Sequence, residues 1–457
     1  MNRFPLLLTA LLFFTNVYSQ KVSFSDKLVS SKYISNGTEL YNLGRTYDAL
    51  MIFKQARVRN PNNWKAHFWV STAEFDLNNY NSALESGNKA LELTKEKEDA
   101  DLNMLLAKIN HKLGNIEQAV AHYKTATNAL GAKAAKEYDL PIYIAQCEFA
   151  LNEKREGVVN KRKLLAPNLN SKYEEYGPIL TNDGKHLFFT ARNSETTGGG
   201  MNPDDQRFFE DMYHAKYNEK TKEFELQVET FEGINTEGFD ALNSVSWDGT
   251  YCLGTLNTSA SKEKSTTSSE IFELSTDVVA DYGSPTVIVN TTINTTYFEG
   301  AASITDTLWI GEEQENYQQI MVFVSDRNGE KSLTDIFSVE KKNGVWGSAK
   351  LLPKHINTPG RETTPFISQD GKYLFFSSDA LPGMGGYDIY YCENVNGEWS
   401  KPINLGGAIN TPDDDTHFQY YPKLKKAVLA GIRENEGVFN YDLFEVNMEG
   451  IDLPFMK

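Results

Sequence analysis

Short apolar strands recur along the C-terminal two-thirds of the chain, with either alternating or fully apolar character. In the clearest copy, residues 361–405, a turn at Gln369–Lys372 precedes the apolar block Tyr373–Phe376. A Gly-rich loop, a strand at Asp388–Cys392, an Asn-Gly turn and a last strand near Trp399–Leu405 follow. Strands separated by Asp-Gly and Asn-Gly turns predict a four-stranded antiparallel meander. One meander cannot bury both of its faces, whereas copies arranged in a ring can.

Two markers alternate along this region, five of each. One is Ile-Asn-Thr or a close variant, and the other is an acidic residue followed by an aliphatic and an aromatic residue. The first marker begins at Leu169, Ile234, Ile293, Ile356 and Ile409, and the second begins at Asp211, Glu270, Asp335, Asp388 and Asp442. Five strand-rich repeats predict a β-propeller of five blades, while the length of the region alone also allows six.

The segment just before the first marker predicts how the ring closes. Lys163-Leu164-Leu165 matches Lys350-Leu351-Leu352, which precedes the fourth marker. We therefore expect the N-terminal side of the ring to supply the last strand of the final blade. This strand would join the propeller directly to the part of the chain before it.

The N-terminal third has a helical pattern. Three segments beginning at Leu43, Leu77 and Leu113 each place an alanine six residues after the leucine and a second alanine seven residues later. The residues after these leucines, Gly44, Asn78 and Gly114, tolerate the left-handed conformation that ends a helix. The alanines allow the next helix to approach closely. These are Ala49, Ala83 and Ala119, then Ala56, Ala90 and Ala126.

This spacing resembles the tetratricopeptide repeat, a helix-turn-helix unit of 34 residues. Phe53 and Tyr123 stand at the aromatic position of the family, and the second unit departs from it with Gly87. A fourth, degenerate unit carries Leu151-Asn152, and we expect its last helix at about Arg155–Leu165. The resemblance implies about four units with a concave groove for peptides or partner proteins, or an array that only supports its neighbour. The implied groove residues are Tyr41, Asn42, Lys65, Phe68, Phe75, Lys108 and His111.

The first twenty residues have the pattern of a secretory signal peptide. One positive charge at Arg3 precedes an apolar run from Phe4 to Phe14, and Ser19 provides a small residue before the expected cleavage site. The run is too short to span a bilayer. No cysteine lies near this site, so no lipid anchor is expected, and the mature chain is predicted to be periplasmic. The three cysteines, Cys147, Cys252 and Cys392, have neither metal-binding nor redox spacing.

Charge differs between the two parts of the chain. Residues 21–160 carry 18 basic and 17 acidic side chains, whereas residues 161–457 carry 26 basic and 45 acidic ones. Such an acidic region repels phosphate backbones and anionic lipids, which argues against nucleic-acid or membrane-surface partners. The densest acidic run, Asp413-Asp414-Asp415, is a weak candidate for a calcium site, and a solvated loop is the alternative.

The sequence contains no nucleophile elbow, zinc-binding histidine pair or phosphate loop, so no cofactor and no enzymatic activity are expected. The segments Pro178–Lys185 and Pro365–Lys372 resemble the WD40-like repeats of TolB-type propellers. Their aspartates are expected to serve turns.

The expected class is therefore an α + β multidomain protein. It divides into a signal peptide (1–20), a tetratricopeptide α-solenoid (21–162) and a TolB/WD40-like propeller (163–457). This combination is similar to the repeat–propeller component of the Bacteroidetes type IX secretion and gliding machinery, but without its lipid-attachment cysteine and OmpA-like domain. The resemblance implies a non-enzymatic periplasmic adaptor for other cell-envelope proteins, associated with peptidoglycan or outer membrane only through those partners. The alternative is a propeller that binds a glycan, a peptide or a cation.

Overall fold

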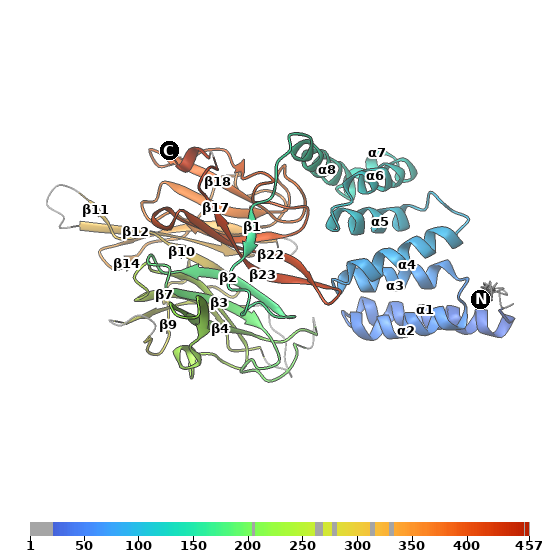
Figure 1. Cartoon of the computed structure of the whole chain (residues 1–457), viewed down its shortest axis with the longest axis horizontal. Helices are drawn as coiled ribbons and strands as arrows, with labels where there is room; N and C mark the ends of the chain where they lie inside the picture. The colour runs from blue at the N-terminus through green and yellow to red at the C-terminus, as the bar shows by residue number, and fades with distance from the viewer. Residues whose placement is uncertain are drawn as a thin grey trace, which may run out of the picture.

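The helices stack into a layered array at one end of the molecule, and the strands form a ring of sheets at the other (Figure 1). The computed structural model describes residues 22–202, 206–260, 268–276, 281–310, 316–328, 333–451 and 453–456, with only the backbone of residues 309 and 310. The expected signal peptide lies outside these residues. The architecture confirms an α-solenoid followed by a propeller, and the described strands form five sheets rather than six.

The helical array is built from pairs in which α1 packs on α2, α3 on α4 and α5 on α6. As predicted, Gly44, Asn78 and Gly114 adopt left-handed conformations at the tight turns, with φ angles of 78°, 59° and 71°. The predicted alanines lie buried where the helices cross. The helices are α1 (Phe24–Asn42), α2 (Thr46–Arg59), α3 (Trp64–Asp76), α4 (Tyr80–Leu93), α5 (Ala100–Lys112), α6 (Ile116–Leu130), α7 (Ala132–Glu137) and α8 (Leu140–Arg155).

The departure at Gly87 reflects a different way of filling the same space. In the first unit, the ring of Phe53 lies against Gly37, where a Cβ would stand 2.4 Å from it. In the second unit, Gly87 leaves room for the side chain of Leu106, which a Cβ would approach to 2.9 Å. Each arrangement pairs one large side chain with one glycine, so both units remain closely packed.

The prediction of a last helix at Arg155–Leu165 is wrong. Helix α8 ends at Arg155, Gly157 takes a left-handed φ of 72°, and strand β1 (Arg162–Leu164) begins soon afterwards. Within the connecting segment, the side-chain amide of Asn160 donates to the carbonyl oxygen of Gly407 at 3.2 Å. Hydrogen bonds to the propeller therefore replace those that a continued helix would have made.

Each blade is an antiparallel sheet, and the first strands of neighbouring blades contact one another around the axis. The first two blades consist of β2 (Glu174–Leu180), β3 (His186–Arg192), β4 (Glu210–Asn218) and β5 (Glu223–Leu226), then β6 (Phe239–Val245), β7 (Tyr251–Asn257), β8 (Glu270–Ser275) and β9 (Thr286–Val287). The third consists of β10 (Glu299–Ile304), β11 (Leu308–Ile310), β12 (Asn316–Ser325), β13 (Asp335–Lys342), β14 (Val345–Trp346) and β15 (Lys350–Leu351). The last two consist of β16 (Glu362–Ile367), β17 (Tyr373–Ser378), β18 (Asp388–Val395), β19 (Glu398–Trp399) and β20 (Ile403–Asn404), then β21 (Asp415–Tyr421), β22 (Lys426–Asn435) and β23 (Val438–Asn447) with β1.

The ring closes as the sequence predicts. Strand β1 pairs antiparallel with β23, with Arg162 opposite Val446 and Leu164 opposite Phe444. The final blade therefore contains one strand from before the first blade and three strands from the end of the chain. Because β1 follows α8 after a short connection, closing the ring also fixes the helical array to it.

The two sequence markers are hydrogen-bonded to each other in every blade. The side-chain oxygen of the marker asparagine accepts the backbone N–H of the aliphatic residue in the other marker, and its amide nitrogen donates to that residue's carbonyl oxygen. The buried N–H gains an acceptor in this way, and the carbonyl gains a second donor in the four blades where it already accepts a backbone N–H. The pairs are Asn170 with Leu443, Asn235 with Met212, Asn294 with Ile271, Asn357 with Ile336 and Asn410 with Ile389.

The hydroxyl residue after each asparagine continues this link into the next blade. Its backbone N–H and its hydroxyl both donate to a carboxylate four residues later, near the start of the next inner strand. One short marker thus connects the third strand of one blade to the first strand of the following blade. The pairs are Ser171 with Glu175, Thr236 with Asp240, Thr295 with Glu299, Thr358 with Glu362 and Thr411 with Asp415.

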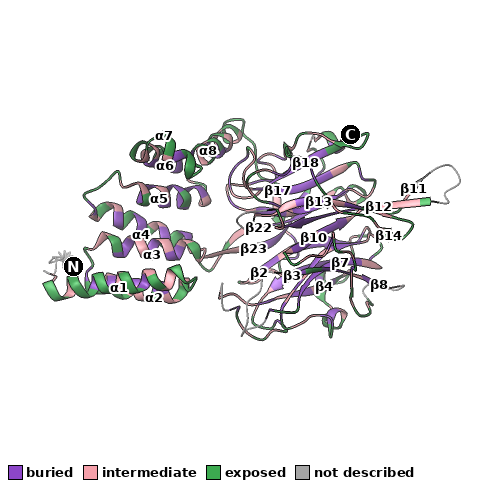
Figure 2. Cartoon of the chain, turned by 180° about the vertical axis from the view of Figure 1, so that it is seen from behind, coloured by how far each residue is buried: buried purple, intermediate pink, exposed green. Residues whose placement is uncertain are grey.

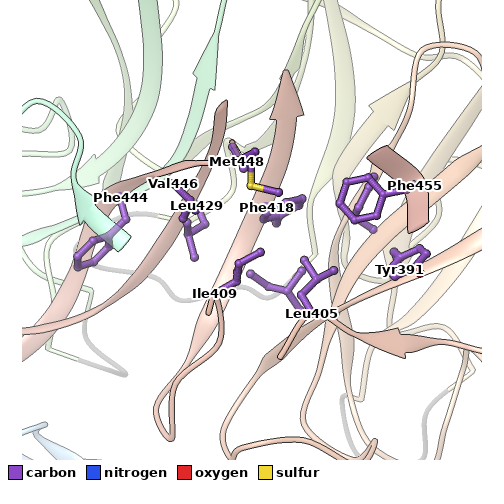
Figure 3. Packing of buried hydrophobic residues seen from close by; sticks show 12 residues of the cluster. Tyr391, Leu405, Ile409, Phe418, Leu429, Phe444, Val446, Met448 and Phe455 are labelled. Atoms are coloured by element: carbon purple, nitrogen blue, oxygen red, sulfur yellow. The ribbon is translucent and has the colours of Figure 1, made fainter. Parts of the chain in front are cut away.

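Apolar side chains fill the space between adjacent blades. Between the fourth and fifth blades, Tyr391, Phe418 and Leu429 pack together and are joined by Met448 and Phe455 from the C-terminal segment (Figure 3). That segment includes the 3-10 helix η3 (Pro454–Met456). The remaining 3-10 helices are η1 (Val228–Phe231) and η2 (Pro422–Leu424).

Replacing one marker asparagine tests the blade link. Asn357→Ala removes an amide that is 8% exposed and leaves the backbone N–H and carbonyl of Ile336 without their side-chain partner. We expect a loss of about 1–3 kcal/mol in the free energy of unfolding, measured by urea denaturation. Lys354→Ala, an exposed change in the same loop, is the control and should leave this free energy within about 0.5 kcal/mol of the unmodified chain. Equal effects of the two substitutions would contradict the link.

Candidate functional site

The predicted groove residues occupy the first helices of successive units, but they do not form one exposed surface. Three are exposed, three are half-buried among other aromatic rings, and one is buried against the propeller. The exposed residues are Asn42, Lys65 and Lys108; the half-buried residues are Tyr41, Phe68 and Phe75; and the buried residue is His111.

Polar side chains from three first helices meet near the propeller end of the groove. The hydroxyl of Tyr41 in α1 donates to the carboxylate of Asp76 in α3. Burial raises the pKa of Asp76, while the Tyr41 hydrogen bond and the nearby ammonium of Lys108 in α5 oppose that rise. The groove therefore presents a short row of a phenol, a carboxylate and an ammonium group.

Aromatic rings surround this polar row. The ring of Trp69 lies 5.6 Å from that of Tyr41 and 5.4 Å from that of Phe68, edge-on in both cases. The ring of Trp64 continues the group, with its centroid 6.3 Å from Phe68. The ammonium of Lys65 lies 5.7 Å from the Trp64 ring. Rings with cations at their edges suit a partner segment that carries both apolar and acidic side chains.

His111 belongs to the joint between the two domains, which corrects its assignment to the groove. It is 5% exposed, and its Nε2 lies 2.8 Å from the carbonyl oxygen of Met384, in a loop of the fourth blade. Burial lowers the pKa of His111 to about 4. Its imidazole is therefore neutral near pH 7 and donates from Nε2 to the Met384 carbonyl.

An ion cluster lies beside His111 at the same joint. The ammonium of Lys112 contacts Asp413 at 2.5 Å and Asp414 at 2.8 Å. Burial lowers the pKa of Lys112, but the two carboxylates outweigh this effect and hold the pKa well above its usual value. The cluster thus connects the end of α5 to the loop that enters the fifth blade.

The acidic run Asp413–Asp415, considered above as a candidate calcium site, takes part in ion pairs instead. Asp413 and Asp414 bind Lys112, and Asp415 pairs with Arg162 of β1 and accepts from Thr411. Across the described residues, no group of three or more histidine, cysteine, aspartate or glutamate side chains is placed to hold a metal ion. The three aspartates join the domains and the ring rather than meeting at one ligand position.

The β22–β23 hairpin forms a second contact between the domains. The N–H of Phe439 donates to the carbonyl oxygen of Asn78 at 3.0 Å, and the Phe439 ring lies 4.7 Å from that of Tyr80. The side chain of Asn81 donates to Glu434 at 3.1 Å. These contacts involve the turns of the array, which face the hairpin in Figure 2, whereas Lys65 and Lys108 remain exposed.

Five carboxylates surround the propeller axis at the mouth that faces the helices. These are the marker partners Glu175, Asp240, Glu299, Glu362 and Asp415, all buried. Two of them have arginine partners: Glu299 contacts Arg327 at 2.9 Å, and Asp415 contacts Arg162. Burial raises the pKa values of Glu175, Asp240, Glu362 and Asp415 to about 7, against the hydrogen bonds from their own markers.

The remaining candidates for chemistry are structural. All three cysteines are buried free thiols. Burial raises the pKa of Cys147 and of Cys392 to about 12, so neither thiol is an effective nucleophile near pH 7. In the described part of the chain, no helix is long and apolar enough to cross a membrane.

Sequence reasoning missed Asp76, Trp69 and Lys112. Lys65, Trp69 and Asp76 share one face of α3 at spacings of four and seven residues, and this periodicity would have identified the first two missed residues. No local signal identifies Lys112, because its partner Asp413 is 301 residues away.

No protein-family model matches the chain, and the search of curated proteins found no relative. Among solved structures, the chain is similar to MamA, with 16% identity and a TM-score of 0.25 over 29% of this chain and 70% of that one. It is similar to the first TPR of Spaghetti (RPAP3) bound to an HSP90 peptide, with 16% identity and a TM-score of 0.25 over 28% and 98% of the two chains. It is also similar to the Yersinia enterocolitica type III secretion chaperone SycD in complex with a YopD peptide, with 12% identity and a TM-score of 0.24 over 26% and 91%.

Removing the cation of the joint should destabilise the protein strongly. Lys112→Ala leaves Asp413 and Asp414 without their shared ammonium, and losing one partner of a buried ion pair typically costs about 3–5 kcal/mol. We expect a loss of that size in urea denaturation, with faster hydrogen exchange at the end of α5. Lys108→Ala, four residues earlier on the same helix, removes an exposed ammonium and is the control. The triple variant Lys112→Met/Asp413→Asn/Asp414→Asn should recover part of the loss.

The buried carboxylate ring predicts a pH dependence of opposite sign to that of ordinary paired carboxylates. The pKa of Asp240 is about 7 in the folded chain, compared with 3.8 ordinarily. Between these values the folded state binds more protons, so the free energy of unfolding falls as pH rises. Each such group contributes up to about 1.4 kcal/mol per pH unit. We therefore expect denaturation midpoints to fall from pH 5 to pH 8, and Asp240→Asn to reduce that fall.

Asp370→Asn is the control for this measurement. Hydrogen bonds from Ser368 and Lys372 outweigh the effect of burial and lower the pKa of Asp370, so its contribution to stability changes only in more acidic solution. This variant should therefore keep the full decline between pH 5 and pH 8. An unchanged decline in Asp240→Asn would show that its carboxylate does not contribute.

Proposed function

We propose that this protein is a non-enzymatic scaffold that holds other cell-envelope proteins in the periplasm of a bacterium, within a type IX secretion or gliding complex. The partner-binding surface is the groove of the helical array, and the propeller holds that groove in a fixed orientation. The combination of signal-peptide pattern, repeat units and propeller supports this assignment. Peptidoglycan and the outer membrane are reached through the partners.

The observation that carries the proposal is that the propeller contacts the array mainly at the turns and ends of its helices and leaves Lys65 and Lys108 of the groove exposed. His111, Lys112 and Asn78 bind the propeller, whereas Lys65 and Lys108 lie on the open face. Stacked repeats create extended concave surfaces of this kind for binding partner proteins. An array that served only as a support would not require an open face with aromatic rings and cations.

The chemistry of the groove defines the segment that it binds. The rings of Trp64, Phe68 and Trp69 accept apolar side chains, and the ammonium groups of Lys65 and Lys108 attract carboxylates. Asp76, already bonded to Tyr41, discourages a purely acidic peptide. The proposed partner is therefore a protein segment with alternating apolar and acidic side chains.

Crosslinking in cells followed by affinity purification and mass spectrometry tests the scaffold. We expect the tagged chain to recover specific envelope proteins, and Lys65→Glu/Lys108→Glu to reduce their recovery at least tenfold because both attractive charges are reversed. The control Lys124→Glu/Lys133→Glu changes two exposed lysines on α6 and α7, outside the groove. Equal recovery by the groove variant and the control would refute groove binding. The absence of any specific partner would refute the scaffold itself.

A further inference from the structure

The propeller mouth opposite the helical array presents a different side chain from each blade. Each inner strand has a bulge, and the residue three positions after the first paired residue beyond that bulge stands at the equivalent place in all five turns. A Ser/Thr-x-Asp-Gly frame flanks this position in three blades, at residues 181–184, 246–249 and 368–371, and the residue at the position differs in each of the five blades. The five residues are Asn182, Trp247, Asp306, Gln369 and Pro422.

Hydrogen bonds hold these variable positions in fixed places. The N–H of Asn182 donates to the carbonyl oxygen of Trp247 at 2.8 Å, and the N–H of Asp306 donates to that of Gln369 at 3.1 Å. With the side-chain amide of Gln369 assigned the orientation that satisfies both neighbours, its oxygen accepts from the indole Nε1–H of Trp247 and its nitrogen donates to Asp306 Oδ2 at 2.8 Å. Since Asp306 Oδ1 has no partner among the described residues, the mouth presents a positioned acceptor that remains available.

A cavity of about 480 Å³ opens beside this polar chain, within the usual range for small-molecule sites. Phe455 of η3 contacts both Tyr373 and Tyr420, with ring centroids 6.0 and 5.4 Å away, and the two tyrosines are half-buried. Phe455 is also seated in the packing between the fourth and fifth blades (Figure 3). The cavity therefore has aromatic walls and a polar end formed by Trp247, Gln369 and Asp306.

The charge of the lining selects the ligand. Asp306 and Asp370 line the cavity, and no arginine, lysine or histidine is among its described lining residues, although the ammonium of Lys423 lies 5.6 Å from the Trp247 ring. Such a site disfavours phosphates and carboxylates. Asp370 is already bonded to Ser368 and Lys372 in its own turn, which leaves Asp306 and the amide of Gln369 for recognition. Aromatic faces beside neutral and anionic acceptors suit a ring that has apolar faces and a rim of hydroxyl groups.

The site is separate from the surfaces that contact the helices. The inner strands have a bulge in every blade, and the cavity at this level, lined in part by Gly177, Ala301 and His417, is only about 20 Å³. The described residues therefore leave little space at the level of the bulges, whereas a cavity of about 230 Å³ lies nearer to Trp247, among the inner strands. A ligand at the second mouth leaves the helical groove free.

We propose that this mouth is a binding site for an uncharged saccharide, with its ring packed between Tyr373, Tyr420 and Trp247 and its hydroxyl groups bonded to Asp306 and Gln369. This site is independent of the proposed scaffold function. Loss of saccharide binding would leave recovery of envelope proteins through the groove unchanged.

Isothermal titration calorimetry with chitotriose, cellotriose and maltotriose tests the site on the purified chain. We expect at least one trisaccharide to bind, and Trp247→Ala and Asp306→Asn each to weaken that binding at least tenfold. Trp346→Ala removes an indole from the outer strand β14 and is the matched control, expected to bind normally. Asp306→Asn preserves shape, so it remains informative if Trp247→Ala fails to fold.

Cosedimentation with purified sacculi, compared with titration of the soluble sugars, distinguishes a wall-bound saccharide from a free one. Binding to either that the mouth variants Trp247→Ala and Asp306→Asn weaken supports the proposal. Trilysine tests the alternative that the mouth binds a cationic peptide instead of a saccharide. Three results would overturn the assignment: no sugar or sacculus binding tighter than about 1 mM, binding that both mouth variants retain, or binding of trilysine alone.

Discussion

The propeller depends on the side chain of one asparagine per blade. At the start of the third strand, the carbonyl of the aliphatic marker residue accepts a backbone N–H in four of the five blades, whereas the N–H of that residue is bonded to the side chain of the marker asparagine. The marker asparagine supplies both a donor and an acceptor there, and the following threonine or serine binds the carboxylate of the next inner strand. Because unsatisfied buried polar groups are costly, each blade requires this short sequence at the same position. The link therefore sets both the spacing between blades and the periodicity of the sequence.

The same link crosses the point where the ring closes, and it accounts for the rigid attachment of the helices. Asn170, which follows β1, binds Leu443 in the last blade. It makes the same pair of hydrogen bonds as Asn357 does with Ile336, but it joins the two ends of the propeller. The short connection between α8 and β1 is itself bonded to a loop of the fourth blade through Asn160 and Lys161, which ties the array to the ring. The Lys112 cluster and the Phe439 contact then fix its angle. An array held by its turns presents its groove to solvent.

Features carried by local chemistry could be predicted from the sequence, and features carried by long-range contacts could not. The left-handed turns at Gly44 and Gly114, the blade strands and the closing strand follow from short patterns whose physical reason lies within a few residues. The predicted helix beyond Arg155 failed because Asn160 and its neighbours bind a blade loop about 250 residues away. The assignment of His111 to the groove is wrong for the same reason, because nothing in the local sequence indicates its partner Met384. The groove assignments of the other six residues stay predictions.

The two mouths of the propeller differ in how strongly the fold restricts their residues. At the mouth facing the helices, the five blades repeat nearly the same buried carboxylate, because each must satisfy the same marker. At the opposite mouth, three blades carry a Ser/Thr-x-Asp-Gly turn in which the hydroxyl donates to the aspartate, so the residue between these two is free of that constraint. Asn182, Trp247 and Gln369 occupy this position, and Asp306 and Pro422 stand at the equivalent place in the two blades that lack the frame. A residue that the fold leaves free can be chosen for what it binds, and loops on a rigid scaffold commonly carry function for this reason. The chemistry specific to this chain is therefore concentrated where the repeat constrains it least.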